Sequence, residues 1–323
     1  MINILDEVKG CRTIGISAHI RPDGDAIGSC MGMALYLEKA IPEGRVDVFL
    51  QECSDALMRN ICGSGQVRHD FKTDVESYDA FICLDCDPPR MGDALEFYKK
   101  AKKQINIDHH ETNPGMGDVC WVVPGASSAC ELVYQTMDPE LIDARIAQNL
   151  YTGMVTDTGI FTYSNTGRQT MEIAGELITY GFDFSTVVRE VFYEKTYLQQ
   201  QMMGLAIGNS SLLLDGRVLA THIDWNALQS YRAGSKDMEG IASELVHTYG
   251  VVCVIFMYEI APGRYKLSLR STGEVNVAEV CAASGGGGHA RAAGTTITAP
   301  YKEIVASLAP LIGAQLDAGV WVK

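Results

Sequence analysis

Short apolar runs that end in acidic or imidazole side chains constrain the fold of this chain more than any other feature. Between residue 1 and about residue 185, runs of strand length alternate with longer segments of helical periodicity. The runs cover residues 13–18, 46–50, 80–84, 104–107 and 119–123, and the helical segments cover 26–40, 92–103, 127–137, 139–154 and 168–181. This alternation predicts an α/β fold with a doubly wound, mostly parallel sheet that has helices on both faces.

Acidic and imidazole side chains follow several of these segments. They are His19, Asp23 and Asp25, then Asp85, then Asp108, His109 and His110, and finally Asp157. Parallel α/β sheets bind ligands beyond the carboxyl ends of their strands, and buried carboxylates are costly unless they share a partner. Oxygen donors with a minority of imidazoles and no sulfur suit Mn²⁺ or Mg²⁺ better than structural zinc. The pattern therefore predicts a metal-dependent hydrolase.

Each of these residues has a plainer interpretation that the sequence leaves open. An Asp at 23 or 25 also caps the helix that follows, and Asp157 also suits an ordinary turn. Asp87 competes with Asp85, but it stands beside two prolines and is better explained as the start of their turn. Because adjacent side chains diverge, we expect one of His109 and His110 to bind metal and the other to face the substrate.

Composition sets the domain count and excludes several classes of partner. The 323 residues, 47% hydrophobic, suffice for two cores: a catalytic domain at 1–185, a helical linker at 186–209 and a smaller α/β domain at 210–323. A net charge of -14 argues against binding long duplex nucleic acid, and no apolar run is long enough to span a membrane.

The ten scattered cysteines, without a secretory leader, favour reduced thiols and a cytoplasmic location. Cys83 and Cys86 form one C-x-x-C, a weak signal for redox or zinc chemistry without a second pair.

The second domain carries a separate motif of anion-binding character. Four glycines at 285–288 precede His289 and Arg291, and Arg270 ends a nearby predicted strand. A flexible glycine loop is the plainer interpretation. Exposed backbone N–H groups, guanidinium groups and an imidazole together favour contact with a phosphate.

Taken in order, the motifs resemble the DHH phosphoesterase superfamily, named for the triplet seen here at 108–110. The order runs His19-x-x-Pro-Asp-x-Asp-x-x-Gly-Ser29, Asp85, Asp-His-His110, Thr156-Asp-Thr-Gly159 and Gly-Gly-Gly-Gly-His289. The last motif resembles the associated C-terminal domain of the NrnA-like branch. That branch contains nano-RNases and 3′-phosphoadenosine-5′-phosphate phosphatases, some of which also cleave cyclic or linear dinucleotides.

The resemblance implies a role for each matched residue. His19 and Asp23 would hold one metal and Asp25, His109 and Asp157 the other, with Asp85 bridging both. Asp85 and His110 would be catalytic, and His110 would contact the scissile phosphate. The substrate's other phosphate and nucleotide would bind Arg270, Ser271, Gly287, Gly288, His289 and Arg291.

The expected activity is therefore a two-metal phosphohydrolase, loaded with two Mn²⁺ or with Mg²⁺ or Co²⁺. It would degrade RNA or DNA oligonucleotides of two to five residues and dephosphorylate 3′-phosphoadenosine-5′-phosphate. The alternatives are a phosphodiesterase for cyclic di-AMP, cyclic di-GMP or their linear products, and a non-catalytic nucleotide-binding module. A homodimer through the first domain is a further hypothesis.

Overall fold

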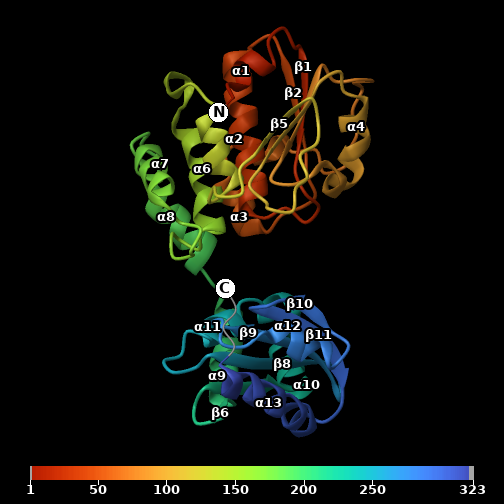
Figure 1. Cartoon of the computed structure of the whole chain (residues 1–323), viewed down its shortest axis with the longest axis vertical. Helices are drawn as coiled ribbons and strands as arrows, with labels where there is room; N and C mark the ends of the chain where they lie inside the picture. The colour runs from red at the N-terminus through yellow and green to blue at the C-terminus, as the bar shows by residue number, and fades with distance from the viewer. Residues whose placement is uncertain (1, 320–323) are drawn as a thin grey trace. The chain divides into compact units, whose positions relative to one another are not determined.

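The computed structural model describes residues 2–319 and divides into two compact units, Met1–Glu194 and Lys195–Lys323 (Figure 1). The first unit contains a five-stranded parallel sheet in the order β2-β1-β3-β4-β5. Its strands are β1 Thr13–Ser17, β2 Arg45–Phe49, β3 Ala80–Leu84, β4 Gln104–Asp108 and β5 Val119–Val122. Its α-helices are α1 Ile4–Glu7, α2 Gly24–Ala40, α3 Asp55–Asn60, α4 Leu95–Lys100, α5 Ala129–Gln135, α6 Ala144–Asp157, α7 Arg168–Ile178 and α8 Phe184–Val188.

Both faces of this sheet are covered, as the near-continuous apolar strands predict. Figure 1 shows α2 and α6 on one side of the strands and α4 on the other. Ile82 and Leu84 of β3 pack in the larger core, while Phe81 and Cys83 pack in a smaller core with Tyr98 of α4. The predicted α/β fold with a mostly parallel sheet is confirmed.

Helices α2 and α6 approach each other along a row of glycines on α2. A Cβ atom at Gly28 would lie 2.6 Å from the carbonyl oxygen of Asn149, and one at Gly32 would lie 2.7 Å from the Leu150 side chain. A Cβ at Gly24 would overlap the Thr156 side chain. Only glycine permits this spacing, which brings the first turn of α2 beside the last turn of α6.

The second unit contains a six-stranded mixed sheet in the order β10-β11-β9-β8-β7-β6, in which only β7 and β8 pair in parallel. Its strands are β6 Ser211–Leu213, β7 Val218–Ile223, β8 Cys253–Ala261, β9 Arg264–Ser271, β10 Gly287–His289 and β11 Ala292–Thr298. Its helices are α9 Tyr197–Gly208, α10 Trp225–Tyr231, α11 Ile241–Leu245, α12 Val277–Ala282 and α13 Tyr301–Ala318. Separate apolar cores lie on its two faces, one with α9, α10 and α11 and the other with α12 and α13.

The helical linker expected over 186–209 is not one continuous helix. A π-helical turn at Arg189–Tyr193 follows α8, the chain is extended at Glu194, and α9 begins at Tyr197. Thr196 and Gln199 form a reciprocal capping box, in which each side chain accepts from the other's backbone N–H. This cap starts a new helix in the middle of the segment, and α9 belongs to the second unit.

Candidate metal centre

The predicted metal ligands lie at the carboxyl edge of the parallel sheet in the first unit. His19 follows β1, Asp85 follows β3, and His109 and His110 follow β4, while Asp157 is the last residue of α6. Three sets of acidic and imidazole side chains there each place one ligand atom per residue within 4.8 Å of the others. All six predicted ligands, from four separated segments, are therefore brought together.

The first ligand group consists of His19, Asp23 and Asp85. His19 Nε2 lies 3.3 Å from Asp85 Oδ2 and 3.8 Å from Asp23 Oδ1. Asp23 also caps α2, because its Oδ1 accepts from the backbone N–H groups of Asp25 and Ala26, each at 3.1 Å. The capping interpretation and the ligand prediction for Asp23 are thus compatible.

The second ligand group consists of Asp25, His109 and Asp157. His109 Nε2 lies 3.8 Å from Asp25 Oδ2 and 3.6 Å from Asp157 Oδ2. These separations exceed hydrogen-bond lengths of about 2.7–3.2 Å, so the donor atoms surround a common space instead of bonding one another. The close packing of α2 on α6 places Asp25 in this group beside Asp157.

Asp85 lies where the two ligand groups meet. Its Oδ1 is 3.3 Å from His109 Nε2, and its Oδ2 faces His19. The residue is 2% exposed, and Oδ1 has no hydrogen-bond partner within the described part of the chain. A buried carboxylate oxygen without a partner is costly, and a cation between the imidazoles would satisfy it. Asp85 also has a left-handed φ of 58°, which turns the chain sharply after β3.

Hydrogen bonds fix the ring orientation of His19 and His109. His19 Nδ1 lies 2.9 Å from the carbonyl oxygen of Ile20, and His109 Nδ1 lies 3.3 Å from that of Ala126. Because a carbonyl only accepts, Nδ1 must donate in each case, and Nε2 is directed at the ligand group. This arrangement is typical of metal-binding histidines.

The electrostatics of the cluster favour added positive charge. Burial, with the nearby carboxylates Asp85 and Asp157, raises the pKa of Asp25 well above its usual range. Burial also raises the pKa of Asp157 to about 6. Burial lowers the pKa of His19, but hydrogen bonds to Asp23 and Asp85 outweigh it and raise that pKa to about 11. The cluster thus draws in protons that divalent cations would replace, and its oxygen and imidazole donors fit Mn²⁺ or Mg²⁺.

Asp108 orients His110, and it also belongs to a third group, with Asp85, His109 and His110, whose ligand atoms lie within 4.8 Å of one another. Its Oδ1 accepts from His110 Nδ1 at 2.8 Å and from the backbone N–H of His109 at 2.7 Å, and its Oδ2 accepts from Asn113 at 2.7 Å. The hydrogen bond to Asp108 is the main cause of the raised pKa of His110. The His110 side chain is partly exposed.

Sequence reasoning missed the asparagines that support this arrangement. Asn106 of β4 is fully buried and donates to the carbonyl oxygens of Cys83 and Cys86, at 3.2 and 2.8 Å, which fixes the turn that carries Asp85. Asn113 donates to Asn106 Oδ1 as well as to Asp108. A polar residue inside an apolar strand was the available signal.

In the second unit, Arg270 and His289 lie in one row across the sheet. Arg270 of β9 is opposite Ala292 of β11, which is opposite His289 of β10, so both side chains project from the same face. Ser271 is on the other face, where its buried Oγ accepts from the backbone N–H groups of Gly273 and Val275. Of the predicted substrate-binding residues, Gly287, Gly288, His289 and Arg291 are exposed.

Arg270 lines a cavity of about 260 Å³ with Lys266, Ser268, Ser243 and Tyr258. Its Nε donates to Ser243 Oγ at 3.1 Å, and its guanidinium has no carboxylate partner among residues 2–319. Burial lowers the pKa of Arg270. A half-buried cation without a counter-ion favours an anionic ligand.

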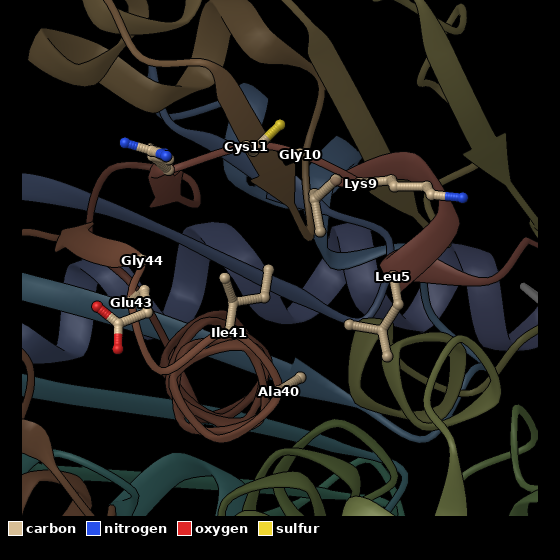
Figure 2. Close-up of a pocket in the computed structure, with 10 residues that line it drawn as sticks. Leu5, Lys9, Gly10, Cys11, Ala40, Ile41, Glu43 and Gly44 are labelled. Atoms are coloured by element: carbon tan, nitrogen blue, oxygen red, sulfur yellow. The ribbon is translucent and has the colours of Figure 1, made fainter.

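Another cavity, of about 470 Å³, lies at the amino ends of β1 and β2, away from the ligand groups. Figure 2 shows the residues that line it, from α1, the end of α2 and the turns before the strands. It contains none of the predicted site residues.

All ten cysteines are free, including Cys83 and Cys86, whose sulfur atoms are 3.6 Å apart. Within the part of the chain that the structure describes, no helix combines the length and apolar character needed to cross a bilayer.

Comparison with known proteins agrees with this geometry. The DHH family, N-terminal domain, matches residues 13–154, and the DHHA1 domain matches residues 216–312. The chain therefore belongs to the DHH family and is a phosphoesterase.

Several relatives match most of the chain. It is 28% identical to the bifunctional oligoribonuclease and PAP phosphatase NrnA of Bacillus subtilis, over 88% of this chain and 89% of that protein. The Thermus thermophilus protein of the same name is 29% identical, over 91% of this chain and 86% of that one. The cyclic-di-AMP phosphodiesterase PdeA of Listeria monocytogenes is 25% identical over 91% of this chain, which matches 47% of that protein.

A solved structure supports the fold. An exopolyphosphatase-related protein from Bacteroides fragilis superimposes with a TM-score of 0.83 and 24% identity, over 98% of this chain and 96% of that one.

Proposed function

We propose that this protein is a two-cation phosphohydrolase that degrades short oligonucleotides to mononucleotides and dephosphorylates 3′-phosphoadenosine-5′-phosphate. One observation carries the proposal: two ligand groups meet at Asp85, a buried carboxylate with an unpaired oxygen. When bound, divalent cations there supply activation of water and neutralisation of phosphate charge. The first ligand group would hold one cation and the second the other, with Asp85 shared between them.

His110 would bind a non-bridging oxygen of the scissile phosphate. Its Nδ1 is fixed by Asp108, and this hydrogen bond raises the pKa of the ring. A cationic donor directed at the phosphate stabilises the negative charge that develops during hydrolysis. Asp108 would therefore act through His110, by holding the ring.

The second unit would bind the far end of the substrate. Arg270 and His289 present a guanidinium and an imidazole from one face of the sheet, and Gly287 and Gly288 before His289 are exposed. A phosphate bound there would favour substrates of a few nucleotides. The names of the Bacillus and Thermus relatives, oligoribonuclease and PAP phosphatase, support this substrate class.

A phosphodiesterase for cyclic dinucleotides or their linear products is the second candidate. The resemblance to the Listeria cyclic-di-AMP phosphodiesterase along most of the chain favours it. A non-catalytic nucleotide-binding module is the third, and the complete ligand set argues against it because nucleotide binding alone does not require six converging metal-ligating side chains.

Substrate panels distinguish these candidates. We would incubate the metal-free protein with pApA, pGpG, cyclic di-AMP and 3′-phosphoadenosine-5′-phosphate, with and without Mn²⁺, Mg²⁺ or Co²⁺. The proposal predicts Mn²⁺-dependent release of mononucleotides from pApA and pGpG and of phosphate from 3′-phosphoadenosine-5′-phosphate. Turnover of cyclic di-AMP, pApA or pGpG without release of phosphate from 3′-phosphoadenosine-5′-phosphate would favour the second candidate, and the absence of any turnover would favour the third.

A further inference from the structure

A single chain segment, residues 126–130, holds two members of the second ligand group directly. The carbonyl oxygen of Ala126 accepts from His109 Nδ1 at 3.3 Å. The backbone N–H of Ala129 donates to Asp25 Oδ2 at 2.6 Å, and that of Cys130 donates to Asp25 Oδ1 at 2.9 Å. The segment thus fixes the imidazole ring and both oxygens of the buried carboxylate.

The same segment reaches the third member through a side-chain bridge. Asn165 Nδ2 donates to the carbonyl oxygen of Ser127 at 3.0 Å and to that of Asp157 at 3.2 Å. The end of α6 is therefore tied to the start of α5. All three members of the second ligand group depend on the position of this one segment.

Glu131 holds the segment in place. Its Oε2 accepts from Ser127 Oγ at 2.6 Å, from the Ser127 backbone N–H at 3.3 Å and from Thr170 Oγ1 of α7 at 2.8 Å. The residue is 3% exposed and has no ion-pair partner among residues 2–319. An ordinary capping box would direct Glu131 to the backbone N–H of Ser128, the N-cap residue. Here the carboxylate instead joins the residue before the cap to another helix.

The first ligand group makes no hydrogen bond to this segment among residues 2–319, and Asp85, which both groups share, is carried by the turn that Asn106 fixes. His19 is held by the carbonyl oxygen of Ile20, and Asp23 by the backbone N–H groups of α2. Loss of the Glu131 contacts should therefore disturb one ligand group and spare the other.

We infer that Glu131 is a positioning residue of the second cation site, which keeps Asp25, His109 and Asp157 converged by holding segment 126–130. The inference rests on the proposed two-cation centre. It assigns Glu131 no contact with substrate or with a cation. Loss of residues that orient metal ligands lowers metal affinity by about 10- to 100-fold, which sets the expected effect.

The test is calorimetric titration of metal-free protein with Mn²⁺ alone. Wild-type protein should bind two ions. Glu131→Met, which keeps the side-chain length but removes the acceptor oxygens, should weaken one of the two binding events by about 10- to 100-fold and leave the other within about threefold. Glu131→Gln retains an acceptor for Ser127 and should restore most of the affinity. If Glu131→Met does not fold, Ser127→Ala removes only the shortest of these hydrogen bonds and should weaken the same binding event.

Asp47→Leu is the matched control for loss of a buried carboxylate. Asp47 of β2 is 4% exposed and accepts from Arg45, Arg68 and Tyr78, outside the ligand groups. It should lower the thermal midpoint and leave both Mn²⁺ affinities unchanged. Unchanged binding in Glu131→Met and Ser127→Ala would overturn the inference, as would equal weakening of both events or the same pattern in Asp47→Leu. A wild-type protein that binds no Mn²⁺ would instead overturn the two-cation centre itself.

Discussion

Replacing Gly28 of α2 with alanine tests whether the contact between α2 and α6 assembles the metal centre. The added Cβ would lie 2.6 Å from the carbonyl oxygen of Asn149, 3.1 Å from the backbone nitrogen of Gly153 and 3.2 Å from Cys130 Sγ. Two of these atoms are backbone and cannot rotate away, so the helices must separate.

The magnitude follows from two opposing effects. Alanine is favoured over glycine inside a helix by about 0.8–1 kcal/mol, whereas overpacking a core costs about 1–3 kcal/mol. Gly175 of α7 is exposed and has no atom within 4 Å of its Cβ position, so Gly175→Ala should show only the favourable effect. The two variants should therefore differ by about 1–3 kcal/mol in the free energy of unfolding, with Gly28→Ala the less stable.

Urea denaturation of the metal-free variants measures this difference. Gly28→Ala should also weaken Mn²⁺ binding at the second ligand group, because Asp25 and Asp157 move apart with the two helices. A Gly28→Ala protein as stable as Gly175→Ala, with unchanged Mn²⁺ affinity, would refute the reasoning.

Three further predictions concern the site. Asp85→Asn should reduce hydrolysis of pApA to background while the metal-free protein unfolds at an equal or higher temperature, because a carboxylate is removed from a crowded cluster. Metal-free protein should lose stability as pH rises, first from about 4 to 6, as Asp157 with its raised pKa ionises, and then from about 6.5 to 11, as His19 loses its proton. In each case the folded state binds the proton more tightly than the unfolded state. The melting temperature measured in EDTA should therefore decrease as pH rises, and saturating Mn²⁺ should reduce this decrease. Arg270→Ala should raise the KM for pApA by about 10-fold or more, from the loss of about 1.5–3 kcal/mol of charge-assisted bonding, and affect an activated phenyl phosphodiester much less.

Each prediction has an outcome that contradicts it. Near wild-type turnover by Asp85→Asn with Mn²⁺ would refute the shared ligand. A metal-free protein whose melting temperature rises between pH 6.5 and 9 would contradict the raised pKa of His19. Equal losses by Arg270→Ala on both substrates would show that the second unit does not select for substrate length.

Much of the first unit follows from its sequence because local and long-range signals agree there. Fully apolar runs such as Ala80–Leu84 form strands that are covered on both faces, and the polar residue after each run lies at the carboxyl edge of a parallel sheet. Convergence of the ligands is therefore a consequence of topology, and the sequence predicted it without distances.

The second unit was harder to predict because its elements are short. Helices α10 and α12 span 7 and 6 residues, too few for a clear helical period, and β10 is a three-residue edge strand inside a glycine run that suggests a loop. The alternation of apolar and polar residues in β9 was clear, but the sequence did not show which face of the sheet each residue at the end of the strand occupies. The resemblance implies that Arg270 and Ser271 both bind substrate, whereas the side chains of these neighbouring strand residues point to opposite faces of the sheet.

The residues that hold the ligand groups in position were the hardest to predict from the sequence. Glu131, Asn106 and Asn165 act through partners that are distant in sequence, and each resembles an ordinary polar residue of a helix, a strand or a turn. Only the folded arrangement identifies what they hold.

Crystals grown with MnCl₂ and measured at the manganese absorption edge test the central claim most directly. The anomalous difference map should contain two peaks in the first unit, one among His19, Asp23 and Asp85 and the other among Asp25, His109 and Asp157, with Asp85 in contact with both. A map without manganese at these residues, or with manganese bound only elsewhere, would contradict the two-cation centre.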